Sequence, residues 1–118
     1  MLFICYPNCS TCKKAQKWLE ENHIAYDVRN IKTENPAPEE LENWHTASGL
    51  PLKRFFNTSG EKYRELQLKD RLADMPQAEQ YALLGTDGML VKRPLLVGDG
   101  FVLVGFREGE WAAKLLAE

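Results

Sequence analysis

The first thirty residues contain two short apolar runs separated by one amphipathic segment. The apolar runs are Leu2 to Tyr6 and Ile24 to Val28, and each has the length of a short strand. The segment between them, from about Ser10 to Asn22, predicts a helix. Its apolar positions at helical spacing are Cys12, Ala15 and Leu19. Strand, helix and strand in so few residues predict a parallel pair of strands joined by a right-handed crossover.

The middle of the chain, about residues 36–85, has a helical pattern broken by turn residues. Pro38-Glu39-Glu40 supplies the proline and acids of a first helical turn, and Gly49 is placed to end that helix. Further helical segments are expected at 51–56, around Tyr63 to Leu72, and from Pro76 to Gly85. We interpret this region as a helical insert.

The last third of the chain returns to strands. Leu95-Leu96-Val97 and residues 101–104 flank an Asp99-Gly100 turn, which predicts a hairpin. A final helix follows, and we expect it to bury Trp111, Ala112, Leu115 and Leu116. The predicted order is βαβ, helical insert, ββα. This order indicates an α/β fold with a small mixed sheet, in a single domain over residues 1–118.

Composition narrows the class of protein. The chain has 118 residues, 44% of them hydrophobic, which is enough for an ordinary packed core. Its formal net charge of −2 disfavours direct binding of nucleic acid by bulk electrostatics. No apolar run approaches membrane-spanning length, and the N-terminus lacks the pattern of a signal peptide. An odd number of cysteines, three, fits a reducing compartment, so we expect a cytoplasmic protein.

The segment Cys9-Ser10-Thr11-Cys12 carries the strongest chemical signal. It lies at the start of the first predicted helix, where free N–H groups and the helix dipole favour a thiolate. The thiolate is the nucleophile of thiol–disulfide exchange, and a CxxC near a βαβ pattern is typical of thioredoxin-like redox proteins. We therefore interpret Cys9 as the nucleophile and Cys12, one turn inside the helix, as the resolving thiol.

Two other interpretations of these cysteines remain. A structural zinc site needs four ligands, whereas this chain offers one CxxC pair, Cys5 and two separate histidines, so no metal is expected. Two inert core cysteines are the second alternative, because Cys12 falls on the apolar face of the helix. Lys13 and Lys14, in the first turns of that helix, support the redox interpretation. Cations there are unfavourable for the helix but favourable for a thiolate.

The segment Lys92-Arg93-Pro94 precedes the third predicted strand. Proline cannot donate a ladder hydrogen bond, so this end of the strand is open or bent. In thioredoxin-like folds a cis proline at this place sets the preceding residue beside the reactive cysteine, which predicts a cis Pro94 and an Arg93 directed at Cys9. A trans proline with a surface arginine is the alternative, because cis bonds are a minority.

Three segments together resemble one family. They are Tyr6-Pro7-Asn8-Cys9-Ser10-Thr11-Cys12-Lys13-Lys14-Ala15, Lys92-Arg93-Pro94-Leu95 and Gly105-Phe106-Arg107. They are similar to the ArsC family of glutaredoxin-like proteins, which includes arsenate reductases and Spx-type redox regulators. The resemblance covers essentially the whole chain and implies a thioredoxin-like fold.

The arsenate reductases of this family use one cysteine to attack arsenate and three arginines to bind its oxygens. The resemblance assigns the nucleophile to Cys9 and two of the arginines to Arg93 and Arg107. The helix start at Ser10 and Thr11 adds N–H groups for an oxyanion. The third arginine is replaced by Asn57, which should weaken arsenate binding and lower arsenate reduction.

The resemblance also implies partners. An enzyme of this kind binds no cofactor and draws electrons from glutathione, or from a glutaredoxin or thioredoxin. The Spx-type branch carries a CxxC and binds the alpha subunit of RNA polymerase, although this chain lacks the longer basic tail of that branch. A third alternative is a member that keeps the fold, has lost the chemistry and serves as a binding module.

Overall fold

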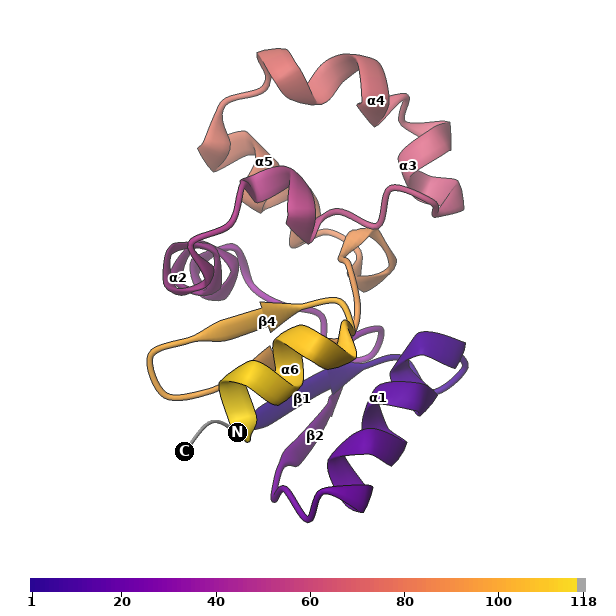
Figure 1. The fold of residues 1–118 in the computed structure, drawn as a ribbon. Coiled ribbons are helices and arrows are strands. Elements are labelled where there is room, and N and C mark those ends of the chain that lie inside the picture. The colour runs from indigo at the N-terminus through magenta and orange to yellow at the C-terminus, as the bar shows by residue number, and fades with distance from the viewer. Residues whose placement is uncertain (117–118) are drawn as a thin grey trace.

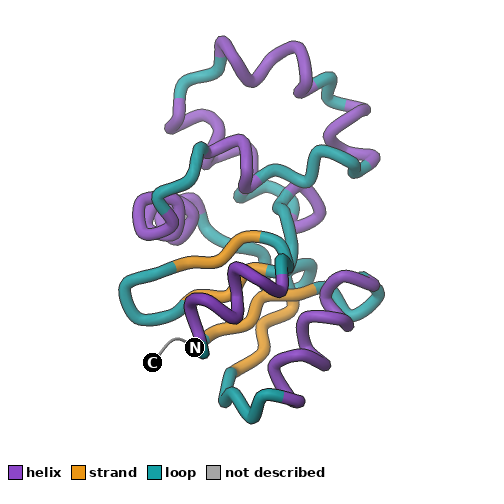
Figure 2. Tube along the Cα trace, in the orientation of Figure 1, coloured by secondary structure: helices purple, strands orange, loops and turns teal. Residues whose placement is uncertain are grey.

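The computed structural model describes residues 1–116 and has a four-stranded mixed sheet with helices packed on it (Figure 1). The strands are β1 (Leu2–Cys5), β2 (Asp27–Asn30), β3 (Leu95–Val97) and β4 (Val102–Val104), in the order β2-β1-β3-β4. β1 pairs in parallel with β2 and antiparallel with β3, and β3 pairs antiparallel with β4 (Figure 2). This mixed sheet confirms the predicted α/β class.

One face of the sheet is covered by α1 (Ser10–Glu21) and α6 (Glu108–Leu115). Strand residues alternate between faces, so Phe3 and Leu96 point into this layer. The helix α1 directs its three predicted apolar residues to the same core. We call this set the α1–α6 core; its fully enclosed members are Phe3, Cys5, Cys12, Ala15, Leu19, Leu96 and Trp111.

Aromatic rings join α1 to α6 within this core. The Trp111 ring lies 6.3 Å from the Trp18 ring and 5.0 Å from the Phe106 ring, both edge to face. Edge-to-face contacts are a favoured arrangement of aromatic pairs. The Trp111 indole N–H donates to the carbonyl oxygen of Gly105 at 2.9 Å, which ties α6 to the end of β4. The position of the first helix is therefore linked to the C-terminal elements.

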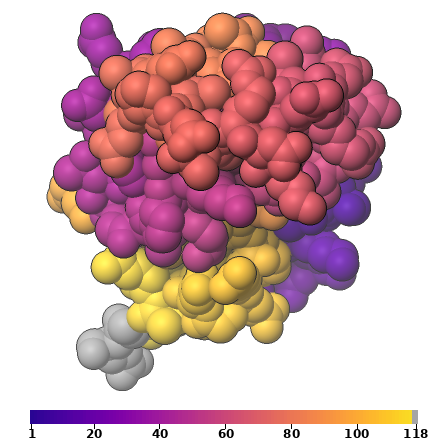
Figure 3. All heavy atoms as spheres, turned by 90° about the horizontal axis from the view of Figure 1, so that it is seen from above, coloured from indigo at the N-terminus to yellow at the C-terminus, as the bar shows by residue number. Residues whose placement is uncertain are grey.

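The helices between β2 and β3 are α2 (Pro38–Ser48), α3 (Glu61–Glu65), α4 (Leu68–Arg71) and α5 (Gln77–Leu84). Of these, α2 packs against the other face of the sheet, and α3 and α4 lie farther from it (Figure 1). Short 3-10 turns cover Leu52–Phe55, Leu72–Asp74 and Gly88–Leu90. The helix α2 ends at Gly49, which has φ +69°, as the sequence predicts. Figure 3 looks down on this insert, which covers much of the molecule in that view.

The second strand lies later in the chain than predicted. It was expected over 24–28, but β2 starts at Asp27, which pairs with Leu2. Ile24 and Tyr26 instead precede the strand and pack against the α1–α6 core. The apolar run therefore marks contacts with the core, whereas the edge strand itself is polar, and its Val28 is 56% exposed.

Two predictions about helices also differ from the structure. The segment around residues 63–72 is not one helix, because Gln67 has φ +53° and separates α3 from α4. This left-handed residue turns the chain so that Tyr63 and Leu68 are both buried. In the C-terminal helix, Trp111 is buried as expected, but Ala112 and Leu115 are only half-buried, and Leu116, which follows the end of α6, is 45% exposed. Within residues 1–116, no helix is long and apolar enough to cross a membrane.

Candidate active site

The candidate nucleophile lies at the N-terminal end of α1. Cys9 occupies the N-cap position in an extended conformation, and its side chain is half-buried. Its N–H donates to the carbonyl oxygen of Tyr6 at 3.0 Å, and its own carbonyl accepts from Lys13 N–H at 3.1 Å. No side chain caps this helix, and its first turn has no acid. The N–H groups of the first turn therefore remain available to an anion or a thiolate.

Cys12 lies one turn into α1 and is only 3% exposed. Its sulfur accepts a hydrogen bond from the Tyr6 N–H at 3.4 Å. Hydrogen bonding with the neighbouring Cys5, together with burial, raises the pKa of the Cys12 thiol well above its ordinary value. All three cysteines are free thiols.

The contact with Cys5 was not anticipated from the sequence. The sequence assigned no role at the site to Cys5, which is buried. However, it ends β1 on the face that carries α1, so its thiol meets Cys12. The sequence could have predicted this contact, because alternation along β1 places Cys5 on the same face of the sheet as Phe3.

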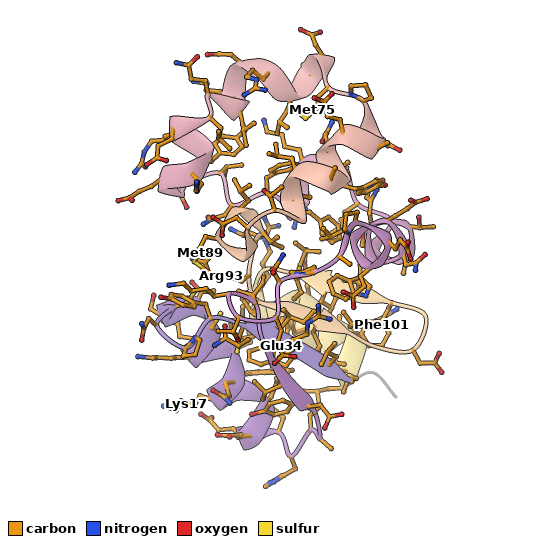
Figure 4. All side chains as sticks on the ribbon, turned by 180° about the vertical axis from the view of Figure 1, so that it is seen from behind. Lys17, Glu34, Met75, Met89, Arg93 and Phe101 are labelled. Carbon is orange, nitrogen blue, oxygen red and sulfur yellow. The ribbon has the colours of Figure 1, made fainter. Side chains whose placement is uncertain are left out.

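The Arg93–Pro94 peptide bond is cis. Arg93 and Cys9 line one cavity of about 460 Å³. The Arg93 guanidinium lies 5.4 Å from the Tyr6 ring, and its Nε and Nη1 atoms are buried without a hydrogen-bond partner. Figure 4 shows Arg93 at the level where the insert meets the sheet, near Met89. Buried donors are nearly always paired, so an unpaired guanidinium indicates a place for an anion.

The other predicted anion ligands divide between two cavities. Thr11 lines the Cys9 cavity and also an adjoining cavity of about 650 Å³. Arg107 lines only the adjoining cavity and forms an ion pair with Glu110 at 3.7 Å. Ser10 is exposed and lines neither cavity. The structure therefore brings Cys9, Thr11 and Arg93 to one cavity, whereas Arg107 lines the adjoining cavity, which shares Thr11 and Lys92 with the first.

Asn57, at the position where the resemblance expects an arginine, lines the Cys9 cavity but is engaged in its wall. Its side-chain amide N–H donates to the Met89 carbonyl at 3.3 Å. Its side-chain oxygen accepts from the Ser59 hydroxyl at 3.3 Å. Asn57 thus holds the turn before α3.

Two cations of the cavity were not assigned from the sequence. Lys92 lines both cavities, and Arg64 of α3 lines the Cys9 cavity. Lys92 could have been assigned to the cavity from the sequence, because it directly precedes Arg93. The position of Arg64 depends on how the insert folds. Lys13, Lys14 and Lys17 are exposed and line neither cavity, and Lys17 pairs with Glu21 at 3.9 Å. In Figure 4, Lys17 lies apart from Arg93.

A thiol pair at the start of the crossover helix, with a cis proline before β3, defines a glutaredoxin-related class of thioredoxin-like folds. The chain belongs to the ArsC family, whose model matches residues 5–114.

Solved structures and curated relatives of the chain span both branches of the family. An ArsC family related protein from Bacteroides fragilis is 58% identical with a TM-score of 0.91, covering 93% of this chain and 92% of that one. An arsenate reductase from Vibrio cholerae is 26% identical with a TM-score of 0.77, covering 98% and 96%. The global transcriptional regulator Spx 1 of Bacillus cereus is 29% identical, covering 88% and 78%.

Proposed function

We propose that this protein is a thiol-based oxidoreductase that acts on a small oxyanion or a disulfide, with Cys9 as nucleophile and Cys12 as resolving thiol. The observation that carries this proposal is that Cys9 and Arg93 line one cavity, and that the Nε and Nη1 atoms of the same arginine are buried without a hydrogen-bond partner. Such a group binds an oxyanion through charge-assisted hydrogen bonds. The helix start of α1 adds further N–H groups on the same side.

The proposed reaction conserves atoms and electrons with either substrate. With arsenate, the Cys9 thiolate forms a sulfur–arsenic bond and one protonated oxygen leaves as water. Cys12 then attacks the Cys9 sulfur, the sulfur–arsenic bond breaks with its electron pair on arsenic, and As(V) leaves as As(III). With a disulfide substrate, Cys9 and Cys12 displace the two thiolates in turn. Both routes leave a Cys9–Cys12 disulfide.

We propose glutathione, or a reduced glutaredoxin or thioredoxin, as the source of electrons that restores the two thiols. Two glutathione molecules would reduce the disulfide and leave as glutathione disulfide. The adjoining cavity supports an anionic donor, because its charged lining consists of cations. These are Lys53, Arg54, Lys92 and Arg107.

Turnover with two substrates tests the proposal. We expect reduction of arsenate, or of hydroxyethyl disulfide, with glutathione and glutaredoxin, and no turnover in Cys9→Ser. Arg93→Gln should lower kcat/KM for arsenate about 10- to 100-fold and change the neutral disulfide much less, since the lost interaction is with charge. Arg71→Gln, an exposed substitution on α4, is the control. Absence of turnover with both substrates would refute the proposed oxidoreductase activity.

The similarity to Spx 1 supports a second candidate, a redox-sensing regulator that binds the RNA polymerase alpha subunit. The thiol pair would then report the redox state to a partner. Binding of the reduced and diamide-oxidised protein to the isolated alpha C-terminal domain tests it. Binding that changes with oxidation, and is insensitive to oxidation in Cys9→Ser, supports the regulator; no binding in either state excludes it.

A further inference from the structure

Besides Arg93, a second arginine lines the Cys9 cavity, and it comes from the helical insert. Arg64, on α3, lines the cavity that contains Cys9 and Arg93. Its Nη1 donates to the Ser59 carbonyl at 3.3 Å, which holds the guanidinium at the wall of the cavity. Within residues 1–116 its guanidinium forms no ion pair. Its remaining donors can therefore turn to an anion without first breaking a salt bridge.

At the two other positions where the family resemblance expects anion-binding arginines, Arg107 and Asn57 are engaged in other contacts. Arg107 faces the adjoining cavity and is paired with Glu110. Asn57 carries no charge, and its amide is engaged with Met89 and Ser59. Neither residue therefore supplies a second positive charge to the Cys9 cavity.

The packing of α3 gives Arg64 a defined position. Tyr63 is buried and its ring lies 6.4 Å from the Phe56 ring, edge to face. The helix begins after Gly60, whose N–H donates to the Asn57 carbonyl at 3.1 Å. Tyr63 thus anchors the helix, and Arg64 follows it directly in the chain. A fixed backbone lowers the entropic cost of using a long side chain.

We propose that Arg64 is the second guanidinium that binds an oxyanion at Cys9, a role that rests on the function proposed above. The same helix carries the opposing charge, since Glu61 also lines this cavity. Arg64 and Glu61 therefore set the affinity of the site for anions in opposite directions, through one short helix.

Protection of Cys9 from alkylation measures this affinity without any activity assay. Inorganic sulfate serves as the probe anion and iodoacetamide, which is neutral, as the reagent, with the modified cysteine identified by mass spectrometry. Arg64→Gln should raise the sulfate concentration for half-protection about 3- to 10-fold. Arg64→Lys should fall between Arg64→Gln and wild type, because it keeps the charge but loses the guanidinium fork. Glu61→Gln should lower that concentration.

Matched controls on α3 are Lys62→Gln and Glu65→Gln, because both residues are exposed and lie outside the lining of the cavity. Arg93→Gln tests the underlying site. If Arg93→Gln weakens protection while Arg64→Gln matches Lys62→Gln, the role of Arg64 is refuted and the proposed function stands. A larger effect of Arg107→Gln than of Arg64→Gln also refutes it. If sulfate protects neither wild type nor any variant, the anion site itself is refuted.

Discussion

At the scale of single residues, the buried thiol of Cys12 has the resolving role in the proposed reaction. Hydrogen bonding with Cys5 and burial both raise its pKa. A raised pKa keeps the thiol protonated at neutral pH, and only the thiolate attacks a disulfide. The attack of Cys12 on the Cys9 sulfur is therefore the step that should depend most strongly on pH.

Formation of the intramolecular disulfide should accelerate as the pH rises from 6 to 9, because the thiolate fraction of Cys12 grows about tenfold per pH unit below its pKa. Oxidation with diamide, quenched at set times and followed by measurement of the remaining free thiols, gives the rate. Cys5→Ala removes the hydrogen-bonding partner of the Cys12 thiol and should increase the rate at pH 7. Equal rates in wild type and Cys5→Ala would contradict this role of Cys5.

The disulfide should join Cys9 to Cys12 and exclude Cys5. Cys9 is half-buried at a helix end, whereas Cys5 and Cys12 are both enclosed. An oxidant therefore reaches Cys9 first, and Cys12, one turn into the same helix, is placed to form the disulfide with Cys9. Peptide mapping of the oxidised, alkylated protein decides this. A Cys5–Cys12 disulfide, or three free thiols after peroxide treatment, would show that the pairing is wrong.

At the scale of elements, one ion pair joins β2 to the insert. The two terminal guanidinium nitrogens of Arg29, Nη1 and Nη2, donate to the Glu40 carboxylate at 2.7 and 2.9 Å. The Glu40 carboxylate also accepts from the Ala37 N–H at 3.0 Å, at the start of α2. The hydrogen bond with Arg29 lowers the pKa of Glu40 below its ordinary value. The pair thus positions α2 relative to the edge strand.

Glu40→Gln should lower the free energy of unfolding by about 1 kcal/mol at pH 7, a modest value because the Glu40 side chain is 38% exposed. Since folding lowers this pKa, the stabilisation is present above the ordinary glutamate value near 4.3 and is lost as the pH falls through the folded value. Urea unfolding at pH 7 and pH 3 measures both. Glu42→Gln, an exposed change on α2, is the control, and a pH-independent difference would contradict the prediction.

The sequence predicted elements well where local signals and core contacts coincide. The start of α1, the end of α2 at Gly49 and the hairpin of β3 and β4 follow from caps, periodicity and turn residues. The position of β2 did not follow, because its apolar neighbours pack on a helix while a polar stretch forms the edge strand. The break at Gln67 has no local signal, since glutamine rarely adopts a left-handed conformation.

For the candidate site, the sequence placed Cys9, Cys12 and Arg93 in one region because they belong to motifs next to recognisable elements. It did not place Arg64, because that position depends on the tertiary packing of Tyr63. It assigned Arg107 to the same site through resemblance alone. A side chain three residues after β4 can face either cavity, and only the folded chain decides between them.

At the scale of the whole molecule, Trp111 holds the C-terminal helix to the sheet. It is fully enclosed, and its indole N–H satisfies the buried Gly105 carbonyl. Trp111→Phe should lower the free energy of unfolding by about 1–3 kcal/mol, from the unpaired carbonyl and the lost volume. Trp44→Phe, in the core on the other face, is the control and should cost less. Urea denaturation of both variants measures this, and equal losses would contradict the importance of the hydrogen bond.

The aromatic contact between α1 and α6 has an optical consequence. Trp18 lies on the helix that carries Cys12, and Trp111 belongs to the same core as that thiol. Indole fluorescence responds to sulfur groups and to changes of packing nearby, so disulfide formation at Cys12 should alter the emission of this pair. Trp44 lies in the core between the sheet and the helical insert and should contribute a constant background fluorescence. The chain thus carries an intrinsic, label-free reporter with which its oxidation can be followed in real time.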